Sequence, residues 1–433
     1  MTAPTYNIFV VGLDDVHLAQ LKALPDAENY RFHALYTHAE LKQQDHFPVA
    51  MLLDEGIDRL KACPEQIDAV VGYWDFPVST LLPLLREAIG LPTTSLESVL
   101  KCEHKYWSRV LQREVIPEYI PPFAAVDPFA EDVLVRPPLP FPFWLKPVKS
   151  LLSHLGFRVE DHDALRRAIR EVRAGISRYA VPFNRILQYA KLPPEIMKVD
   201  GHYCIAEAII SEGRQCTLEG YVWRGDVVVY GVVDSLRDGP AGSSFSRYQY
   251  PSTLPVTVID RMRDICRRFM RHIGYRDAPF NIEFYWDERN DRIWLLEINT
   301  RISKSHAPLF YMVDGCYHHK IMLDLALQRA PELPHRQGAF ACAAKFMLRR
   351  FEDAFVTRVP SAEEIRRLEG DHPGVTIQIE VEEGMRLSSL RDQDSYSYEV
   401  AVIFVGAHSE AELEAIYGRV VERLPLEFSS PRS

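Results

Sequence analysis

The sequence predicts a protein of mixed fold class, α/β at its N-terminal end and α+β beyond it. Short apolar runs alternate with helix-like stretches over residues 6–89, and runs typical of antiparallel strands occupy residues 203–233 and 279–298. Residues 336–433 again alternate strands with a helix. A chain of 433 residues is too long for one compact core, so several domains are expected.

The composition argues against several classes of protein. Hydrophobic residues make up 47% and charged residues 25%, both ordinary for a globular protein. The net charge of −10 and the lack of a long Lys/Arg run argue against a nucleic-acid partner. The sequence contains no stretch of about 18 apolar residues, so no membrane-spanning helix is expected. The N-terminus lacks the basic region of a signal peptide. The seven cysteines form no CxxC pair, so we expect reduced thiols in a cytoplasmic protein.

The N-terminal region is predicted to be a small open parallel sheet with helices between its strands. Ligands of such sheets bind beyond the carboxyl ends of the strands. Trp74 and Asp75 follow one such end and are expected to line a substrate cleft. The predicted strands are Tyr6–Val11, Phe32–Tyr36 and Ile67–Gly72, and the predicted helices are His17–Ala23 and Val78–Ile89.

The middle of the chain is predicted to begin with one helix over Leu96–Glu114. The proline-rich passage 117–142 cannot be a continuous helix or a central strand, and it reads as a linker with a short edge strand. Residues 236–253 are rich in glycine, serine and proline and are expected to form a mobile loop. The C-terminal region reads as an α+β unit of its own, with one helix near Ala411–Val421. The other expected elements are strands at Phe143–Pro147, Phe157–Val159, Tyr203–Ile210, Gln215–Trp223 and Asp226–Val233, and helices at Ala164–Ala174, Val256–Ile273 and Pro308–Arg329.

The most specific chemical feature is a predicted hairpin of the strands Pro279–Trp286 and Arg292–Ile298. Alternate residues of a strand share a face, so Glu283 on one strand can meet Glu297 and Asn299 on the next. Both glutamates lie in apolar runs, where a carboxylate needs a partner. Two carboxylates and an amide oxygen suit Mg²⁺ that is bound together with nucleotide phosphates.

Basic residues accompany this hairpin. Lys146 lies in an apolar strand and must reach water or an anion, for which a phosphate is a natural partner. Arg301 follows the hairpin and is placed to reach the same phosphates or a substrate carboxylate. Lys304 and His306 are further candidates for a substrate carboxylate, with simple solvation of a loop as the alternative.

The order and spacing of these residues resemble the ATP-grasp superfamily, specifically its carboxylate–amine ligase branch. That branch includes the D-alanine–D-alanine ligases and the dipeptide ligases, and it is more distantly similar to biotin carboxylase. The resemblance implies an N-terminal open parallel-sheet domain over 1–98 and a central grasp over 99–335, with a lid subdomain at about 118–210. A C-terminal α+β lobe over 336–433 completes the implied fold.

The resemblance also implies roles for individual residues. The metal ligands would be Glu283, Glu297 and Asn299, and Arg301 and Lys146 would be the catalytic cations. ATP and Mg²⁺ are the implied cofactors, with Mn²⁺ as an alternative metal. The nucleotide contacts would be made by Lys105, Lys146, Ser150, Ser153, Glu207, Ala208, Ile209 and Gln215.

Three positions depart from the family pattern. The phosphate loop Lys149–Gly156 is poor in glycine, and bulky side chains hinder the close approach by which backbone amides hold a phosphate. Ser150, Ser153 and His154 would then donate instead. Gln215 stands where many members carry a ribose-binding carboxylate, and Thr300 replaces a proline.

The implied activity is the formation of an amide or peptide bond. A substrate carboxylate would take the γ-phosphoryl group of ATP to give an acyl phosphate, and an amine would then displace phosphate. The expected partners are therefore a small carboxylate and a small amine, with amino acids foremost. A homodimer is an open alternative to a monomer, since dimers are common in the family. Two other functions stay open: a bicarbonate-activating enzyme similar to biotin carboxylase, and an ATP-binding regulator without turnover.

Overall fold

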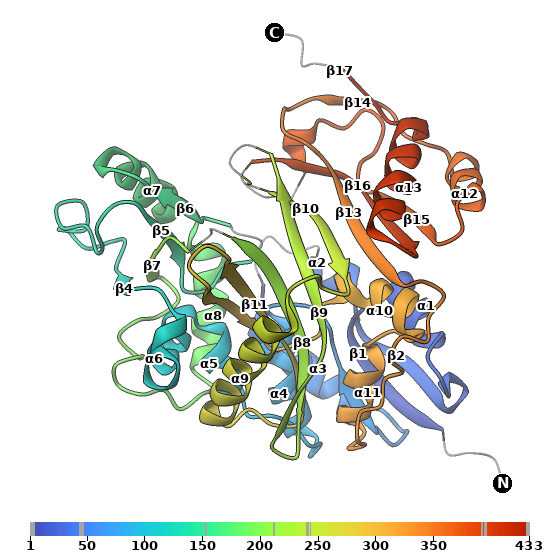
Figure 1. Cartoon of the computed structure of the whole chain (residues 1–433). Coiled ribbons are helices and arrows are strands. Elements are labelled where there is room, and N and C mark those ends of the chain that lie inside the picture. The colour runs from blue at the N-terminus through green and yellow to red at the C-terminus, as the bar shows by residue number, and fades with distance from the viewer. Residues whose placement is uncertain are drawn as a thin grey trace.

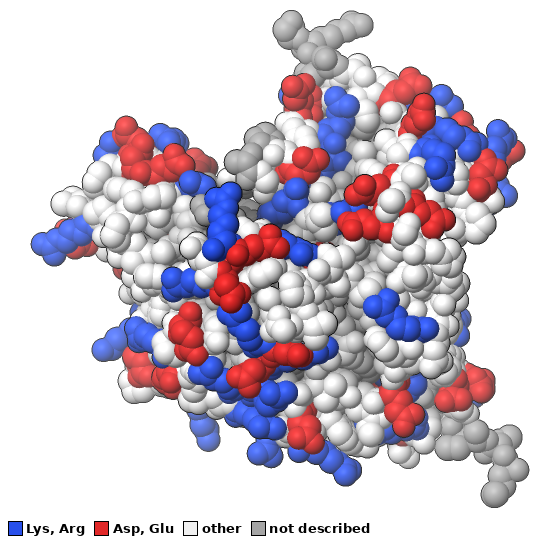
Figure 2. Space-filling model, in the orientation of Figure 1, with Lys and Arg blue, Asp and Glu red and all other residues white. Residues whose placement is uncertain are grey.

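The computed structural model describes residues 5–42, 47–151, 154–210, 213–239, 242, 244–390, 393 and 396–429. Figure 1 shows a long twisted sheet through the middle of the molecule, with an N-terminal region below it and two further regions above it on either side. Lys/Arg and Asp/Glu side chains are interspersed over the face drawn in Figure 2. Within the described ranges, no helix combines the length and the apolar character needed to cross a membrane.

The N-terminal sheet has three parallel strands in the order β2-β1-β3. Helices α3 to α5 pack on one face, and α1 together with α11 packs on the other. Both faces are therefore buried, which explains why β1 is a continuous apolar run. The predicted open parallel sheet is confirmed. Its elements are β1 (Tyr6–Leu13), α1 (Asp15–Lys22), β2 (Tyr30–Thr37), α2 (His38–Lys42), α3 (Val49–Lys61), β3 (Ala69–Val71) and α4 (Val78–Ala88), with α11 (His319–Ala326) supplied from later in the chain.

The prediction of one helix over Leu96–Glu114 is wrong, because the chain bends at His104 (φ −84°, ψ 96°). The Trp107 amide donates to Nδ1 of His104, and Nε2 donates to the carbonyl of Val199 at 2.8 Å. Both imidazole nitrogens are thus satisfied in a buried position, and the side chain caps a second helix. The bend makes Lys105 the first residue of that helix. The two helices are α5 (Leu96–Glu103) and α6 (Lys105–Val115).

A small antiparallel sheet in the order β4-β7-β5-β6 forms the region that Figure 1 draws at the upper left. Helix α7 begins after Asp161, whose side chain accepts a hydrogen bond from the Ala164 amide, and it buries its apolar face on the sheet. Strand β4, which follows the first prolines, is an edge strand as predicted. The elements are β4 (Phe123–Val126), β5 (Phe143–Pro147), β6 (Phe157–Val159), α7 (His162–Gly175), α8 (Ser177–Leu187) and β7 (Cys204–Ala208).

The central sheet is antiparallel, in the order β12-β11-β8-β9-β10-β13-β16-β15. Helix α9 (Val256–Ile273) packs its apolar face against β8 and β11 and encloses a core cluster together with α5. The strands are β8 (Arg214–Trp223), β9 (Asp226–Asp238), β10 (Ser244–Tyr250), β11 (Ala278–Asp287), β12 (Arg292–Asn299), β13 (Cys342–Arg350), β15 (Val375–Ile379) and β16 (Tyr398–Ala407).

The predicted loop over 236–253 is also wrong, since β9 continues to Asp238 and β10 occupies Ser244–Tyr250. Phe245, Tyr248 and Tyr250 favour a strand, and β10 is paired along both edges, with β9 and with β13. The glycines that suggested a loop, at 239 and 242, lie between the two strands.

The C-terminal region contains two helices, α12 (Ala362–Asp371) and α13 (Glu410–Arg423), where only one was predicted. Helix α12 begins with a capping box in which Ser361 and Glu364 bond each other's backbone amides. This Ser-x-x-Glu pattern can be recognised in the sequence. The strands of this region extend the central sheet through β13, and β14 (Phe355–Arg358) pairs with β17 (Glu427–Ser429). Helix α10 (Ala307–Asp314) packs beneath the β10–β13 junction.

Candidate active site

A cavity of about 1680 Å³ is lined by side chains from the N-terminal sheet, the small sheet and the central sheet. Trp74 and Asp75, beyond the end of β3, line it as expected from the position of ligands at parallel sheets. Ile209 is described and does not line the cavity, and Ser153 lies outside the described residues. The other predicted site residues all line it: Lys105, Lys146, Ser150, Glu207, Ala208, Gln215, Glu283, Glu297, Asn299 and Arg301.

The β11–β12 hairpin holds its polar residues in register. Glu283 lies directly opposite Glu297, and Asn281 lies opposite Asn299. The buried Asn281 accepts a hydrogen bond from Nδ2 of Asn299 at 2.9 Å and donates to the carbonyl of Arg301 at 3.0 Å. These bonds fix the orientation of the Asn299 amide, whose carbonyl oxygen is the atom that a cation would require.

The two opposed carboxylates have different electrostatic surroundings. Burial, and then the charge of Glu297, raise the pKa of Glu283 from 4.5 to about 7. Burial also opposes ionisation of Glu297, but Lys105, Lys146 and Lys149 together outweigh it and lower the pKa of that carboxyl. Nζ of Lys105 lies 2.7 Å from Oε1 of Glu297. Glu297 is thus paired with a lysine, while Glu283 accepts a hydrogen bond from Gln215 at 3.0 Å and is attracted more weakly by Arg237 and Arg301.

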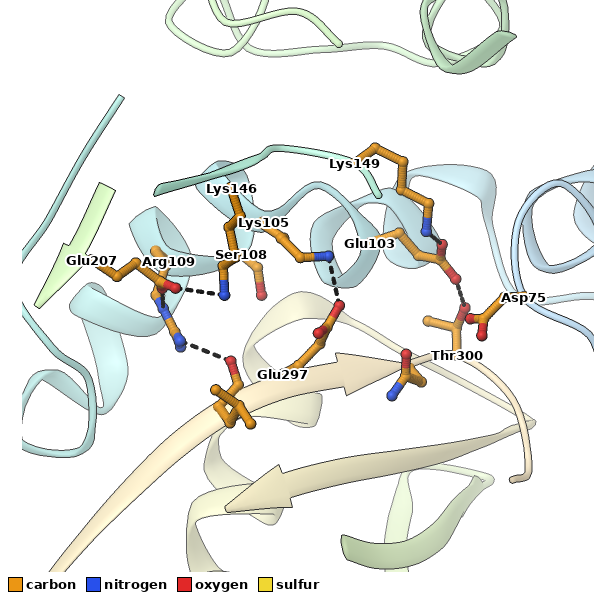
Figure 3. A network of polar contacts seen from close by, with 12 residues as sticks. Asp75, Glu103, Lys105, Ser108, Arg109, Lys146, Lys149, Glu207, Glu297 and Thr300 are labelled. Carbon is orange, nitrogen blue, oxygen red and sulfur yellow. Dashed lines mark hydrogen bonds and ion pairs between the residues drawn. The ribbon is translucent and has the colours of Figure 1, made fainter. Parts of the chain in front are cut away.

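A second ion-pair cluster joins the small sheet to α6. Glu207 on β7 accepts from Nε of Arg109 at 2.5 Å and lies 2.6 Å from Nζ of Lys146 on β5. Figure 3 shows both cations converging on this carboxylate while Lys105 turns toward Glu297. Burial would raise the pKa of Glu207, but the two cations outweigh it and lower the pKa to about 2.

Two further ion pairs border the cavity. Lys149 pairs with Glu103 at the end of α5, and Glu103 also accepts a hydrogen bond from Thr300 at 2.8 Å. Arg301 pairs with Asp75 of the N-terminal region. The Lys149–Glu103 pair thus connects the loop after β5 with α5. The Arg301–Asp75 pair connects the segment after β12 with the N-terminal region.

A family model described as the carbamoyl-phosphate synthase L chain, ATP binding domain, matches residues 250–330, the segment that contains the hairpin. No curated protein matches the chain. Among solved structures, the chain is similar to the L-amino acid ligase from Bacillus licheniformis, with 18% identity, 100% of each chain covered and a TM-score of 0.73. It is also similar to carboxyaminoimidazole ribonucleotide synthase from Aspergillus clavatus complexed with ATP, with 14% identity, 97% of this chain and 98% of that chain covered and a TM-score of 0.65.

A third similar structure is the biotin carboxylase domain of 2-oxoglutarate carboxylase from Hydrogenobacter thermophilus, solved with MgADP, ADP and bicarbonate. Its identity is 13%, with 98% of this chain and 90% of that chain covered and a TM-score of 0.62. The chain has the ATP-grasp fold. The predicted resemblance to the ATP-grasp superfamily is thereby confirmed at the level of the fold.

The donor set of the ATP-grasp hairpin fits a magnesium ion that is held together with phosphate oxygens. Glu283 and Glu297 face each other, and the pKa of Glu283 is raised by burial and then by the charge of Glu297, both of which a bound cation would offset. Within the part of the chain that the structure describes, no group of three His, Cys, Asp or Glu residues forms a metal site by itself. Oxygens of the nucleotide would therefore have to complete the coordination of the metal.

Sequence reasoning missed Arg109, Glu103 and Glu219. The first could have been found, because Lys105 and Arg109 are four residues apart and share one face of a helix. Glu103 gives no such signal, since its partner Lys149 is 46 residues away.

Glu219 is fully buried on β8 and holds the segment that follows the hairpin. It accepts from Nδ1 of His306 at 2.8 Å and from the amide of Ser303 at 3.4 Å. Tyr230 donates to the same carboxylate at 3.4 Å. The sequence could have indicated this role, because Glu219 lies within a predicted strand that is rich in apolar residues, and a buried carboxylate requires partners.

Because Glu283 is buried opposite another carboxylate, replacing it is predicted to stabilise the folded protein. The folded-state pKa of Glu283 lies above its ordinary value, so the stability that this group contributes is present below pH 4.5 and lost as the pH rises through about 7. We expect Glu283→Gln to raise the free energy of unfolding by about 1–3 kcal/mol at pH 8, with little change at pH 5. Urea denaturation in the presence of EDTA measures both values.

The matched control is Glu288→Gln, in the exposed turn of the same hairpin, which should alter neither value. A Glu283→Gln protein that is no more stable than the wild type at pH 8 would show that the two carboxylates do not repel each other.

Proposed function

We propose that the chain is an ATP-dependent carboxylate–amine ligase, which forms an amide or peptide bond through an acyl phosphate with Mg²⁺. The observation that carries this proposal is the convergence of Lys105, Lys146 and Arg301 with the Glu283–Glu297 pair on one cavity. Cations from α6, the lid and the hairpin end would thus surround a triphosphate beside a metal site. The likeness to the L-amino acid ligase supports amino acids as the substrates.

The protein's part in this reaction is to bind, align and neutralise. Lys105 and Lys146 would neutralise phosphate oxygens, and Arg301 would stabilise the transferring phosphoryl group or the substrate carboxylate. Glu283, Glu297 and Asn299 would hold Mg²⁺, which supplies charge neutralisation of phosphate oxygens when bound. No nucleophile from the protein is required, because the attacking groups belong to the two substrates.

The adenine base is proposed to lie near the hinge at Glu207 and Ala208. The Ala208 amide donates to the carbonyl of Pro122 at 2.9 Å, so the base would have to use other groups of this hinge. Gln215 accepts from Nε of Arg237 at 3.0 Å and lines the same cavity, where it would offer a polar contact to the ribose.

Phosphate release from MgATP tests the proposal. Amino acids, short carboxylic acids and bicarbonate are added singly and in pairs, and the products are identified by mass spectrometry. We expect ADP formation to require a carboxylate together with an amine and to yield their condensation product. Turnover with bicarbonate alone would instead indicate a bicarbonate-activating enzyme. Binding of MgATP without turnover across the panel would favour an ATP-binding regulator.

A further inference from the structure

Two lysines line the cavity outside the groups already assigned to ATP and metal. Lys304 lies five residues after the end of β12, and Lys345 lies on β13, directly opposite Tyr248 of β10. Nζ of Lys304 is 4.2 Å from the ring centroid of Trp74, and Nζ of Lys345 is 5.9 Å from that of Tyr248. Each ammonium group therefore has an aromatic ring as its neighbour.

These aromatic neighbours are themselves held in place. Nε1 of Trp74 donates to the carbonyl of Gly12 at 2.7 Å, and the indole stacks on His38 with centroids 3.9 Å apart. The ring of Tyr248 packs edge-on against that of His306 at 5.1 Å. His306 is fixed by the buried Glu219, so both lysines lie beside rings that are anchored by other contacts.

Neither lysine has a carboxylate partner within the described part of the chain, in contrast to the phosphate-site cations Lys105 and Lys146. The acids that attract Lys345 are Glu399 and then Glu380, and Glu399 is already paired with Arg349 at 2.8 Å. Asp14 and Asp75 also attract Lys304. Two partly buried ammonium groups that have no paired carboxylate are nevertheless unfavourable, unless an anion supplies the missing partner.

The charge of Lys345 also acts on Lys304. Burial, and then the charges of Lys345 and Arg301, lower the pKa of Lys304 to about 8. Burial lowers the pKa of Lys345 as well. Tyr248 places the two ammonium groups in one part of the cavity, because its ring neighbours Lys345 and packs against His306, which is two residues from Lys304. One anion in this part of the cavity can therefore interact with both lysines.

We propose that Lys304 and Lys345 form an anion subsite for the non-nucleotide substrate. This inference rests on the proposed function and deepens it: one of the two substrates carries an acidic group, a carboxylate or a phosphate, that does not take part in bond formation. Lys304 is three residues from Arg301, so a substrate held here by its second charge would have its reacting end beside the phosphoryl-transfer site. The subsite would thus select acidic substrates over uncharged ones of the same size.

The experiment measures the thermal unfolding midpoint, Tm, of the full chain with Mg²⁺ and a saturating non-hydrolysable ATP analogue. The increase in Tm on adding the analogue reports nucleotide binding by itself. Malonate and inorganic phosphate are then titrated as probes of the subsite, with malonamide as the uncharged control. The probe with the lower half-effect concentration identifies the preferred source of the negative charge.

We expect the better probe to raise Tm in the wild type, and its half-effect concentration to rise by about tenfold or more in Lys304→Met and in Lys345→Met. Both variants should fold, since each loses a buried charge that has no ionic partner. Lys345→Arg should retain binding because it keeps the charge. Lys198→Met, at an exposed lysine between α8 and β7, should behave like the wild type.

Equal half-effect concentrations in the wild type and both methionine variants would overturn the subsite, as would the failure of both probes to stabilise the wild type. The titrations are repeated without the nucleotide analogue and compared among the variants in the same way. Failure of the analogue to raise Tm would count against the proposed function, while the dependence of anion binding on the two lysines would still decide the subsite.

Discussion

Replacing Glu297 with glutamine is expected to lower the rate of ADP formation from MgATP by about a hundred- to a thousandfold. Glu297 faces Glu283 across the hairpin and pairs with Lys105, so it belongs both to the proposed metal site and to the phosphate site. Glutamine keeps the size of the side chain and removes its charge. The measurement is phosphate release with the substrate pair that best stimulates the wild type.

Glu288→Gln is the control, because it changes the same type of residue in the exposed turn of the same hairpin. Its rate should equal that of the wild type. A Glu297→Gln enzyme that retains more than a tenth of the wild-type rate would remove this carboxylate from the proposed metal site.

The largest effect on stability is expected at Glu207. Its charge compensates Arg109, whose side chain is only 3% exposed, and Lys146 of β5. Glu207→Gln leaves both cations without an ionic partner in the interior, which is expected to cost about 3–5 kcal/mol in the free energy of unfolding at pH 7. Urea denaturation monitored by circular dichroism measures the difference.

The stabilising effect of Glu207 is also expected to depend on pH. The folded-state pKa of Glu207, about 2, lies below its ordinary value of 4.5. Its stabilising contribution is therefore present above pH 4.5 and lost as the pH falls through about 2, so the wild type and the variant should converge in acid. Glu195→Gln, at an exposed position after α8, is the control. Variants of equal stability at pH 7 would show that the cluster does not stabilise the fold.

The hairpin was predictable from the sequence, because its geometry depends on local rules. The two-residue period of a strand fixes which side chains share a face, and the polar turn brings the second strand back beside the first. Glu283 and Glu297 are opposite each other for this reason. The parallel N-terminal sheet was predictable on similar grounds, from the alternation of apolar runs and amphipathic helices.

The errors arose where distant contacts override local preference. The break at His104 depends on a hydrogen bond to Val199, 95 residues away, which no local pattern reveals. The partner of Arg109 is 98 residues away for the same reason. Strand β10 was mistaken for a loop because the glycines beside it outweighed its aromatic residues, and the pairing of both its edges decides the outcome.

The continuous central sheet has a consequence for how such a chain can diversify. Strands β12 and β13 belong to one continuous sheet, with β11, β8, β9 and β10 between them, so the backbone fixes the spacing between the hairpin carboxylates and Lys345. Mutation at position 345 can therefore change the charge presented to a ligand without moving the carboxylates. Related proteins could acquire new substrates through single substitutions along the sheet, while the carboxylates of the proposed metal site on β11 and β12 stay in place.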